Sequence, residues 1–170
     1  MYIPDIPDNN LKPQLEELVY IANKIDTEVS EDDKYSLLFD FNASATEEEI
    51  KNLEKELNVS LPIGYKEFLL FSNGAQLCGH YAEFSNTARI AKINKLRKTS
   101  NFPEDYITIA TIIGDGEILC FSKETGKFIR YFDGREITFD DFYLVFKWLL
   151  ELIRNSAEEY VDLWVIKILN

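Results

Sequence analysis

The chain has 170 residues, 46% of them hydrophobic and 14% aromatic, so its length and composition predict one globular domain with a single core. Its formal net charge of −12 argues against nucleic acid as a ligand, because a phosphate backbone requires a basic surface. No run approaches the roughly 18 apolar residues of a membrane span. The start MYIPDIPDNN lacks the segments of a signal peptide, so we expect a cytoplasmic protein.

The N-terminal part of the chain predicts a helix, an acidic loop and a strand. The helix is expected to begin at Pro13 and to run to about Asn23, with apolar residues at helical spacing. The acidic stretch 26–34 predicts a loop, and the alternating apolar residues of 35–41 predict a half-buried strand. Residues 1–62 hold 15 acidic and 5 basic residues, a charge of −10, so most of the negative charge lies here. A basic protein is therefore a plausible partner.

The stretch from Thr46 to Gly74, TEEEIKNLEKELNVSLPIGYKEFLLFSNG, predicts two short amphipathic helices. Thr46 and Glu49 form a capping box, which satisfies two of the free amides at the start of the first helix. Pro62 suits the first position of the second helix, because its missing amide costs nothing there. Asn73 or Gly74 supplies the left-handed residue that ends it. The residues expected to face the core are Ile50, Leu53, Leu57, Tyr65, Phe68, Leu69 and Phe71.

The following residues predict a run of strands joined by tight turns. Short strands are expected at 75–77 and 81–84, and a short helix at 87–98. Longer strands are expected at 107–113, 117–121 and 127–132. The sequences Gly114-Asp115-Gly116 and Asp133-Gly134 are typical of hairpin turns.

The C-terminal part predicts two helices. Thr138 is expected to cap a helix over 139–153, and Ser156 with Glu159 forms a capping box that is expected to open a last helix. The whole pattern predicts the α+β class, with a mostly antiparallel sheet of about five to six strands and helices packed against it. Four side chains are expected to be fully buried: Leu53, Phe68, Phe121 and Phe146.

The chain offers few residues suited to catalysis. Cys78 and Cys120 lie in apolar segments, so we expect reduced, buried thiols. His80 is the single histidine, and its closeness to Cys78 leaves a cysteine hydrolase open as an alternative. No zinc or calcium spacing is present, so we expect no catalytic, metal-binding or cofactor-binding residues. The sequence therefore predicts a binding protein rather than an enzyme.

The spacing T-E-x-E-I-x-x-L-E-x-x-L-x-V-x-L-P-x-x-Y-K-x-F-L, followed by Asn73-Gly74, resembles the opening signature of the SUKH superfamily. The similarity continues through residues 107–121, ITIATIIGDGEILCF, and ends with the F-x-x-F helix at 139–153. It covers about residues 36–155 of a single domain, 1–170, so the helices expected in 1–25 and 156–170 would be additions to the family core. The resemblance implies a mostly antiparallel sheet with packed helices, which agrees with the pattern of elements.

The SUKH superfamily includes many bacterial immunity proteins and a fungal cell-wall synthesis regulator. The resemblance therefore implies a protein that binds a cognate toxin, often one that degrades or modifies nucleic acid, and neutralises it by occlusion. A regulatory scaffold is the alternative among binding proteins. Loops on a rigid scaffold often carry binding, so acidic residues of the loop and the hairpin tips are the expected contacts. These residues are Glu31, Asp32, Asp33, Asp115, Glu117, Asp133 and Glu136.

Overall fold

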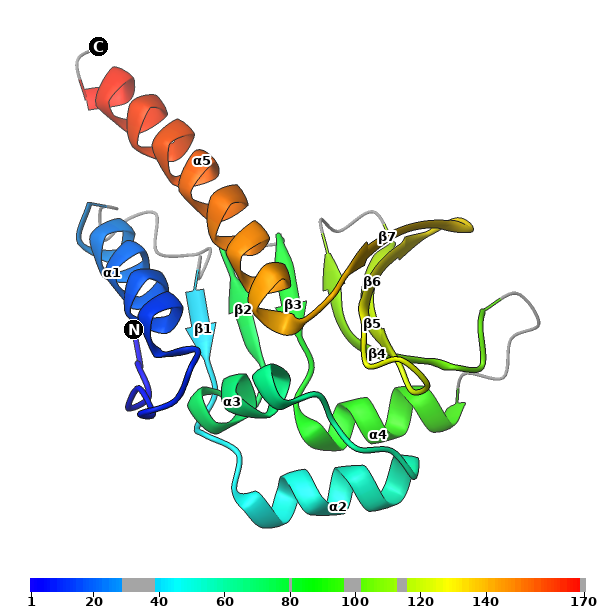
Figure 1. Cartoon of the computed structure of the whole chain (residues 1–170). Helices are drawn as coiled ribbons and strands as arrows, with labels where there is room; N and C mark the ends of the chain where they lie inside the picture. Colours follow the sequence, from blue (N-terminus) through cyan, green and yellow to red (C-terminus); the bar gives the residue numbers. More distant parts are fainter. Residues whose placement is uncertain (29–38, 80, 97–101, 113–115, 169–170) are drawn as a thin grey trace.

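The computed structural model of the protein describes residues 1–28, 39–79, 81–96, 102–112 and 116–168, and the side chains of these residues except 26–28 and 156–168. Figure 1 shows the arrangement of its helices and strands. The helices are α1 (Lys12–Glu28), α2 (Glu47–Leu57), α3 (Ile63–Phe71), α4 (Thr87–Leu96) and α5 (Phe142–Ile168). The strands are β1 (Phe39–Phe41), β2 (Ala75–Leu77), β3 (Ala82–Phe84), β4 (Tyr106–Ile112), β5 (Glu117–Ser122), β6 (Phe128–Phe132) and β7 (Arg135–Phe139).

The seven strands form one antiparallel sheet in the order of the sequence, from β1 to β7. The predicted α+β class is confirmed, with one strand more than the upper estimate. The additional strand is β7, which follows a two-residue turn at Asp133 and Gly134, where φ is +46° and +77°. Positive φ at both positions matches the twist of a two-residue hairpin, so the chain turns back onto β6. Thr138 therefore lies in a strand, and its predicted role as a helix cap is wrong.

Helix α5 is one continuous helix from Phe142 to Ile168. Its cap is Asp141, whose carboxylate accepts a hydrogen bond from the Leu144 backbone N–H at 2.9 Å. The predicted second helix start at Ser156 is wrong, since no Gly or Pro interrupts the segment and a cap forms only where the backbone leaves the helix. Helix α1 also runs further than predicted, to Glu28, into the stretch that we expected to be a loop.

The two helices predicted between Thr46 and Gly74 are confirmed. Thr46 donates its backbone N–H to Glu49 Oε2 at 2.7 Å, and Glu49 donates its N–H to Thr46 Oγ1 at 3.2 Å, which completes the capping box. Asn58, with φ of +50°, ends α2 in the left-handed conformation.

Pro62 is the residue before α3 rather than its first residue. The prediction that Asn73 or Gly74 ends α3 in the left-handed conformation is wrong, because the helix ends at Phe71 and its cap residue Ser72 is extended, with φ of −144°. Gly74 does have a positive φ, of +90°, but it lies two residues beyond that cap.

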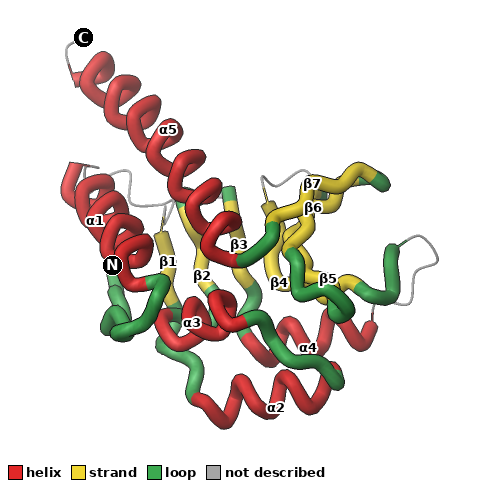
Figure 2. The backbone as a smooth tube through the Cα atoms, viewed as in Figure 1, coloured by secondary structure: helices red, strands yellow, loops and turns green. Residues whose placement is uncertain are grey.

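Helices α1, α3 and α5 cover one face of the sheet, as Figures 1 and 2 show. The centre of this layer is aromatic: the Phe68 ring lies 4.7 Å from that of Phe84 and 5.7 Å from that of Phe146, and Phe142 lies 5.3 Å from Phe128. Helix α1 contributes fully buried leucines and packs along α5. The four side chains predicted to be fully buried are confirmed, with exposed fractions of 2% for Leu53, 0% for Phe68 and Phe121, and 1% for Phe146.

Helix α4 packs against α2 and borders the other face of the sheet. Asn94 of α4 accepts the Thr108 backbone N–H at 2.9 Å and donates to the Thr108 carbonyl at 2.8 Å, so the helix is tied to β4. Lys95 of α4 pairs with Glu56 of α2 at 2.5 Å. On this face the residues of β1 to β3 that point away from the core are not buried, and they form the surface described next.

Candidate protein-binding surface

The structure places two of the predicted contact residues on the exposed β6–β7 hairpin. Asp133 lies in its turn, and Glu136 lies on β7. The Tyr106 hydroxyl donates to Glu136 Oε2 at 3.0 Å, and desolvation together with this hydrogen bond raises the pKa of Tyr106 to about 12. The predicted contact residues Glu31, Asp32, Asp33 and Asp115 lie outside the described residues.

Glu117 is not the solvated hairpin-tip residue that we expected. It lies at the start of β5 with 9% of its surface exposed and forms a bidentate ion pair with Arg130 of β6, whose Nη2 is 2.9 Å from Glu117 Oε2. The Arg130 guanidinium also lies over the Trp148 ring of α5, 4.1 Å from its centroid. Glu117 is on the side of the strand that faces α5, so its carboxylate is needed to balance a partly buried arginine.

A row of polar side chains crosses β1, β2 and β3 on the face opposite the core. The strand register pairs Asp40 with Gln76 and Gln76 with Glu83. In each strand the flanking residues are buried, so the middle residue points to the open side of the sheet. These three residues line a partly open depression of about 160 Å³, which is completed by residues around the start of α4. This depression, which we call the polar depression, is lined by Asp40, Asn42, Ala75, Gln76, Glu83, Phe84, Ser85, Asn86 and Arg89.

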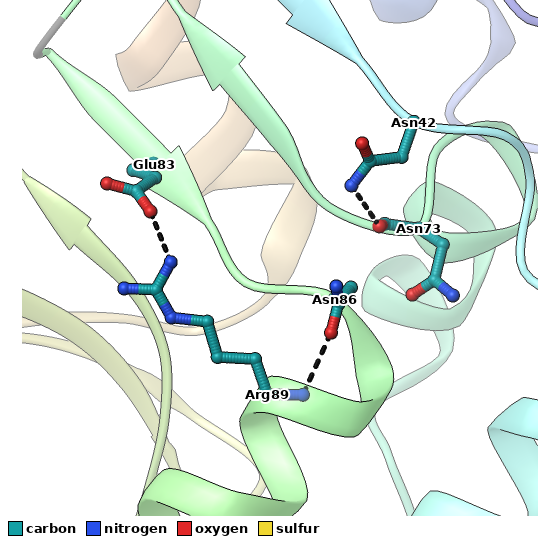
Figure 3. A network of polar contacts seen from close by, with 5 residues as sticks. All are labelled: Asn42, Asn73, Glu83, Asn86 and Arg89. Atoms are coloured by element: carbon teal, nitrogen blue, oxygen red, sulfur yellow. Dashed lines mark hydrogen bonds and ion pairs between the residues drawn. The ribbon is translucent and has the colours of Figure 1, made fainter.

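The polar groups of the depression are held in place by hydrogen bonds and one ion pair, drawn in Figure 3. Asn86 accepts the Arg89 backbone N–H at 2.8 Å, which positions the first turn of α4. The Arg89 side chain reaches back to Glu83, with Nη1 to Oε1 at 2.5 Å. Asn42 donates to the Asn73 carbonyl at 2.7 Å. Both members of the ion pair are about half exposed, so the pair contributes little to stability and remains accessible to a partner.

The Asn-Gly end of the two-helix stretch has a structural role beside this depression. Asn73 Oδ1 accepts the Thr87 backbone N–H at 2.8 Å, and Asn73 Nδ2 donates to Thr87 Oγ1 at 3.2 Å, which caps α4 from another segment. A Cβ atom on Gly74 would lie 2.8 Å from the Asn86 nitrogen and 2.9 Å from the Phe84 oxygen. Asn73 and Gly74 therefore support the polar depression, and they do not line it.

Cys78 does not have the properties of a catalytic nucleophile. It is 1% exposed, and burial raises its pKa to about 11, whereas an active thiol needs a lowered pKa. Cys120 is buried as well, with Sγ 3.4 Å from the Ile129 carbonyl, and neither cysteine is in a disulfide. His80 lies outside the described residues.

The described residues contain neither a metal-binding cluster nor a membrane-spanning helix. Within them, no group of three or more His, Cys, Asp or Glu side chains could hold a metal ion. No helix in the same part of the chain is long and apolar enough to cross a bilayer.

The polar depression and the β6–β7 hairpin are separate surfaces. β1 and β7 are the two edges of the sheet, and seven strands spaced about 4.8 Å apart put roughly 29 Å between them along the sheet. The depression was not predicted from the sequence, although one polar residue stands between two apolar ones in each of 39–41, 75–77 and 82–84. The register that aligns the three polar residues could not be read from any one strand.

An antiparallel sheet covered on one face by helices, with an open polar depression on the other, places the protein in the α+β class. The SMI1/KNR4 family (SUKH-1) matches residues 44–162, from just before α2 into α5. This match covers more than half of the chain, and the protein belongs to this family. The chain is also similar to an uncharacterized protein of Bacillus subtilis (strain 168), YnaB, with 35% identity over 71 residues. That segment spans 42% of this chain and 46% of YnaB, less than half of either protein.

Proposed function

We propose that the protein is a non-catalytic immunity protein, which binds a cognate toxin and blocks its active surface. One observation carries the proposal: a chain of the SMI1/KNR4 family presents an open polar sheet face whose side chains are held by rigid elements. The resemblance to the SUKH superfamily implies toxin neutralisation, and the depression offers a surface for it. The raised pKa of Cys78 supports a binding role over the cysteine hydrolase alternative.

The charge of the chain suits a basic partner, as a toxin that acts on nucleic acid would be. A net charge of −12 attracts a basic protein over long distances, and carboxylates can take the place of the phosphates that such a toxin binds. In the polar depression, Asp40 is the exposed carboxylate on the edge strand, while Glu83 is paired with Arg89. Asn42 and Asn86 add amide groups, which both donate and accept hydrogen bonds. A mixed surface of this kind can recognise backbone groups as well as basic side chains.

Asp133 and Glu136 remain a second predicted contact surface at the opposite edge of the sheet. The acidic residues 31–33 and Asp115 also remain predictions. Glu117 is excluded from this set, because its carboxylate is engaged with Arg130 and is mostly buried. Charge reversals at Asp133 and Glu136, and separately at Asp40, can therefore show which edge of the sheet contacts the toxin.

The proposal is tested by the rate at which the protein associates with its cognate toxin. The toxin is sought as the C-terminal domain of a large protein encoded beside this gene, and that domain, purified in an inactivated form, is the probe. We expect Asp40→Lys to slow association about tenfold at low salt, because opposed charges no longer steer the encounter. Glu124→Lys is the matched control, since Glu124 is an exposed acid in the β5–β6 turn, outside both surfaces. Equal rates for the two variants would contradict a role for the polar depression.

A further inference from the structure

The outer edge of β7 is the largest unpaired strand edge that the described residues present. β7 is five residues long and is the last strand of the sheet, whereas β1 at the other edge has three residues. All residues of β7 are exposed except Phe139, which is half-buried. An edge of this length is open to pairing with another strand.

The turn at Asp133 and Gly134 determines which backbone groups of β7 point outward. In a two-residue hairpin the residues that flank the turn, Phe132 and Arg135, form a hydrogen-bonded pair. The pairs then alternate, so Ile137 also bonds to β6, while the N–H and C=O groups of Glu136 and Thr138 point away from the sheet. The edge thus offers two donors and two acceptors at defined positions.

The edge also has apolar side chains, and its protection against pairing is limited to the charges of Arg135 and Glu136. Ile137 is 53% exposed, and Phe132, on the same face of the hairpin, is 41% exposed. Natural edge strands are commonly protected by charged side chains, by proline, by a bulge or by a very short length. β7 contains no proline, and its register with β6 is regular throughout.

We propose that β7 pairs antiparallel with β7 of a second copy of this chain, in a symmetric dimer centred on Ile137. In this register Glu136 lies opposite Thr138 of the second copy, and the two exchange both backbone hydrogen bonds. Symmetry repeats the exchange, which gives four hydrogen bonds. Ile137 then lies opposite Ile137 of the second copy as a non-hydrogen-bonded pair, where side chains approach most closely.

Three registers of the two β7 strands would pair the outward N–H and C=O groups of Glu136 and Thr138. Side-chain charge favours the one centred on Ile137. A shift in one direction places Glu136 opposite Glu136 of the second copy, and a shift in the other places it opposite Asp140. Like charges directly opposite each other destabilise a strand pair. The register centred on Ile137 instead places each Glu136 opposite a threonine hydroxyl, which can donate to the carboxylate.

The local charge permits a second copy of the chain to pair at this edge. Residues 127–142 contain three basic and four acidic residues, so the region carries only −1 of the net charge of −12. The charges beside this edge therefore repel a second copy only weakly, while the net charge of the whole chain opposes association and is screened by salt. With five strand residues on each side, the interface is smaller than the roughly 20 to 30 residues of a stable complex, so we expect a weak, concentration-dependent dimer.

Sedimentation velocity of the full chain, from about 5 µM to about 500 µM, tests the proposal. We expect the native chain and Thr138→Ala to shift from monomer toward dimer as concentration rises. Thr138→Pro removes two of the four hydrogen bonds without disturbing the bonds to β6, and should weaken self-association at least about tenfold. A native chain that stays monomeric throughout, or a folded Thr138→Pro protein that associates like Thr138→Ala, overturns the proposal.

Cross-linking tests the register and does not depend on the folding of Thr138→Pro. Ile137→Cys is expected to form a covalent dimer under mild oxidation, because the paired Cβ atoms lie within disulfide range. The native cysteines are buried and should not interfere. Thr111→Cys, exposed on β4 away from the edge, is the control and should stay monomeric. A failure of Ile137→Cys to cross-link above this control contradicts the pairing.

Discussion

Replacing Gly74 by alanine tests whether the Asn-Gly sequence is structural. Gly74 has φ of +90°, a conformation that costs an L-residue about 1–2 kcal/mol. The added Cβ would also lie 2.8 Å from the Asn86 nitrogen and 2.9 Å from the Phe84 oxygen, both backbone atoms that cannot move aside cheaply. Such overpacking costs about 1–3 kcal/mol, so we expect a total loss of about 2–5 kcal/mol of stability.

The assay is thermal unfolding followed by circular dichroism, with Gly126→Ala as the matched control. Gly126 has φ of +70° but nothing within 4 Å of an added Cβ, so its substitution incurs only the backbone cost. At about 2–4 °C per kcal/mol, we expect Tm to fall by roughly 4–20 °C for Gly74→Ala and by about 2–8 °C for Gly126→Ala, with Gly74→Ala the lower of the two. If the two variants melt within a degree or two of each other, the close backbone contact does not explain why glycine occupies position 74.

Three further predictions concern buried polar groups. Tyr65→Phe should leave stability unchanged or raise it by about 1 kcal/mol, because the buried Tyr65 hydroxyl has no hydrogen-bond partner among the described residues. Burial raises the pKa of Tyr65, so the native chain should lose stability once the pH exceeds about 10, the pKa of a tyrosine in the unfolded chain. Tyr65→Phe should therefore resist alkaline unfolding better than the native chain. A native chain that resists alkali better than the variant would refute this. Glu117→Gln should lower the free energy of unfolding in urea by about 2–3 kcal/mol, because the partly buried Arg130 loses its charged partner. The control Glu136→Gln, at an exposed position, should lower it by less than about 0.5 kcal/mol. Equal losses for the two variants would contradict the buried ion pair. Iodoacetamide at neutral pH should leave Cys78 unmodified until the protein is denatured, and rapid labelling of the folded protein would revive the hydrolase alternative.

Local signals in the sequence were sufficient to predict most of the elements. The capping box at Thr46 is formed as expected, and the aromatic side chains predicted for the core are buried. These features depend on residues that are close in sequence or on simple periodicity. The same local reasoning failed at Thr138 and Ser156, where a capping residue was present but its backbone lies within a strand or a helix.

The candidate site was harder to predict because it depends on pairing between distant segments. Asp40, Gln76 and Glu83 are far apart in the sequence and meet only through the register of three strands. Glu117 was misjudged for a related reason: its position after a turn indicated exposure, but the curvature of the sheet and the packing of α5 bury it against Arg130. Neither arrangement follows from composition or spacing.

Protection of growing cells tests the central claim most directly. A toxin domain is sought in a large protein encoded beside this gene, and it is expressed in a bacterial host, alone or together with this protein. The account predicts that co-expression restores growth through a stable complex of the two proteins, and that a toxin domain from an unrelated system is not neutralised. Unrelieved toxicity, when this protein is folded and abundant in the same cells, would contradict the immunity function.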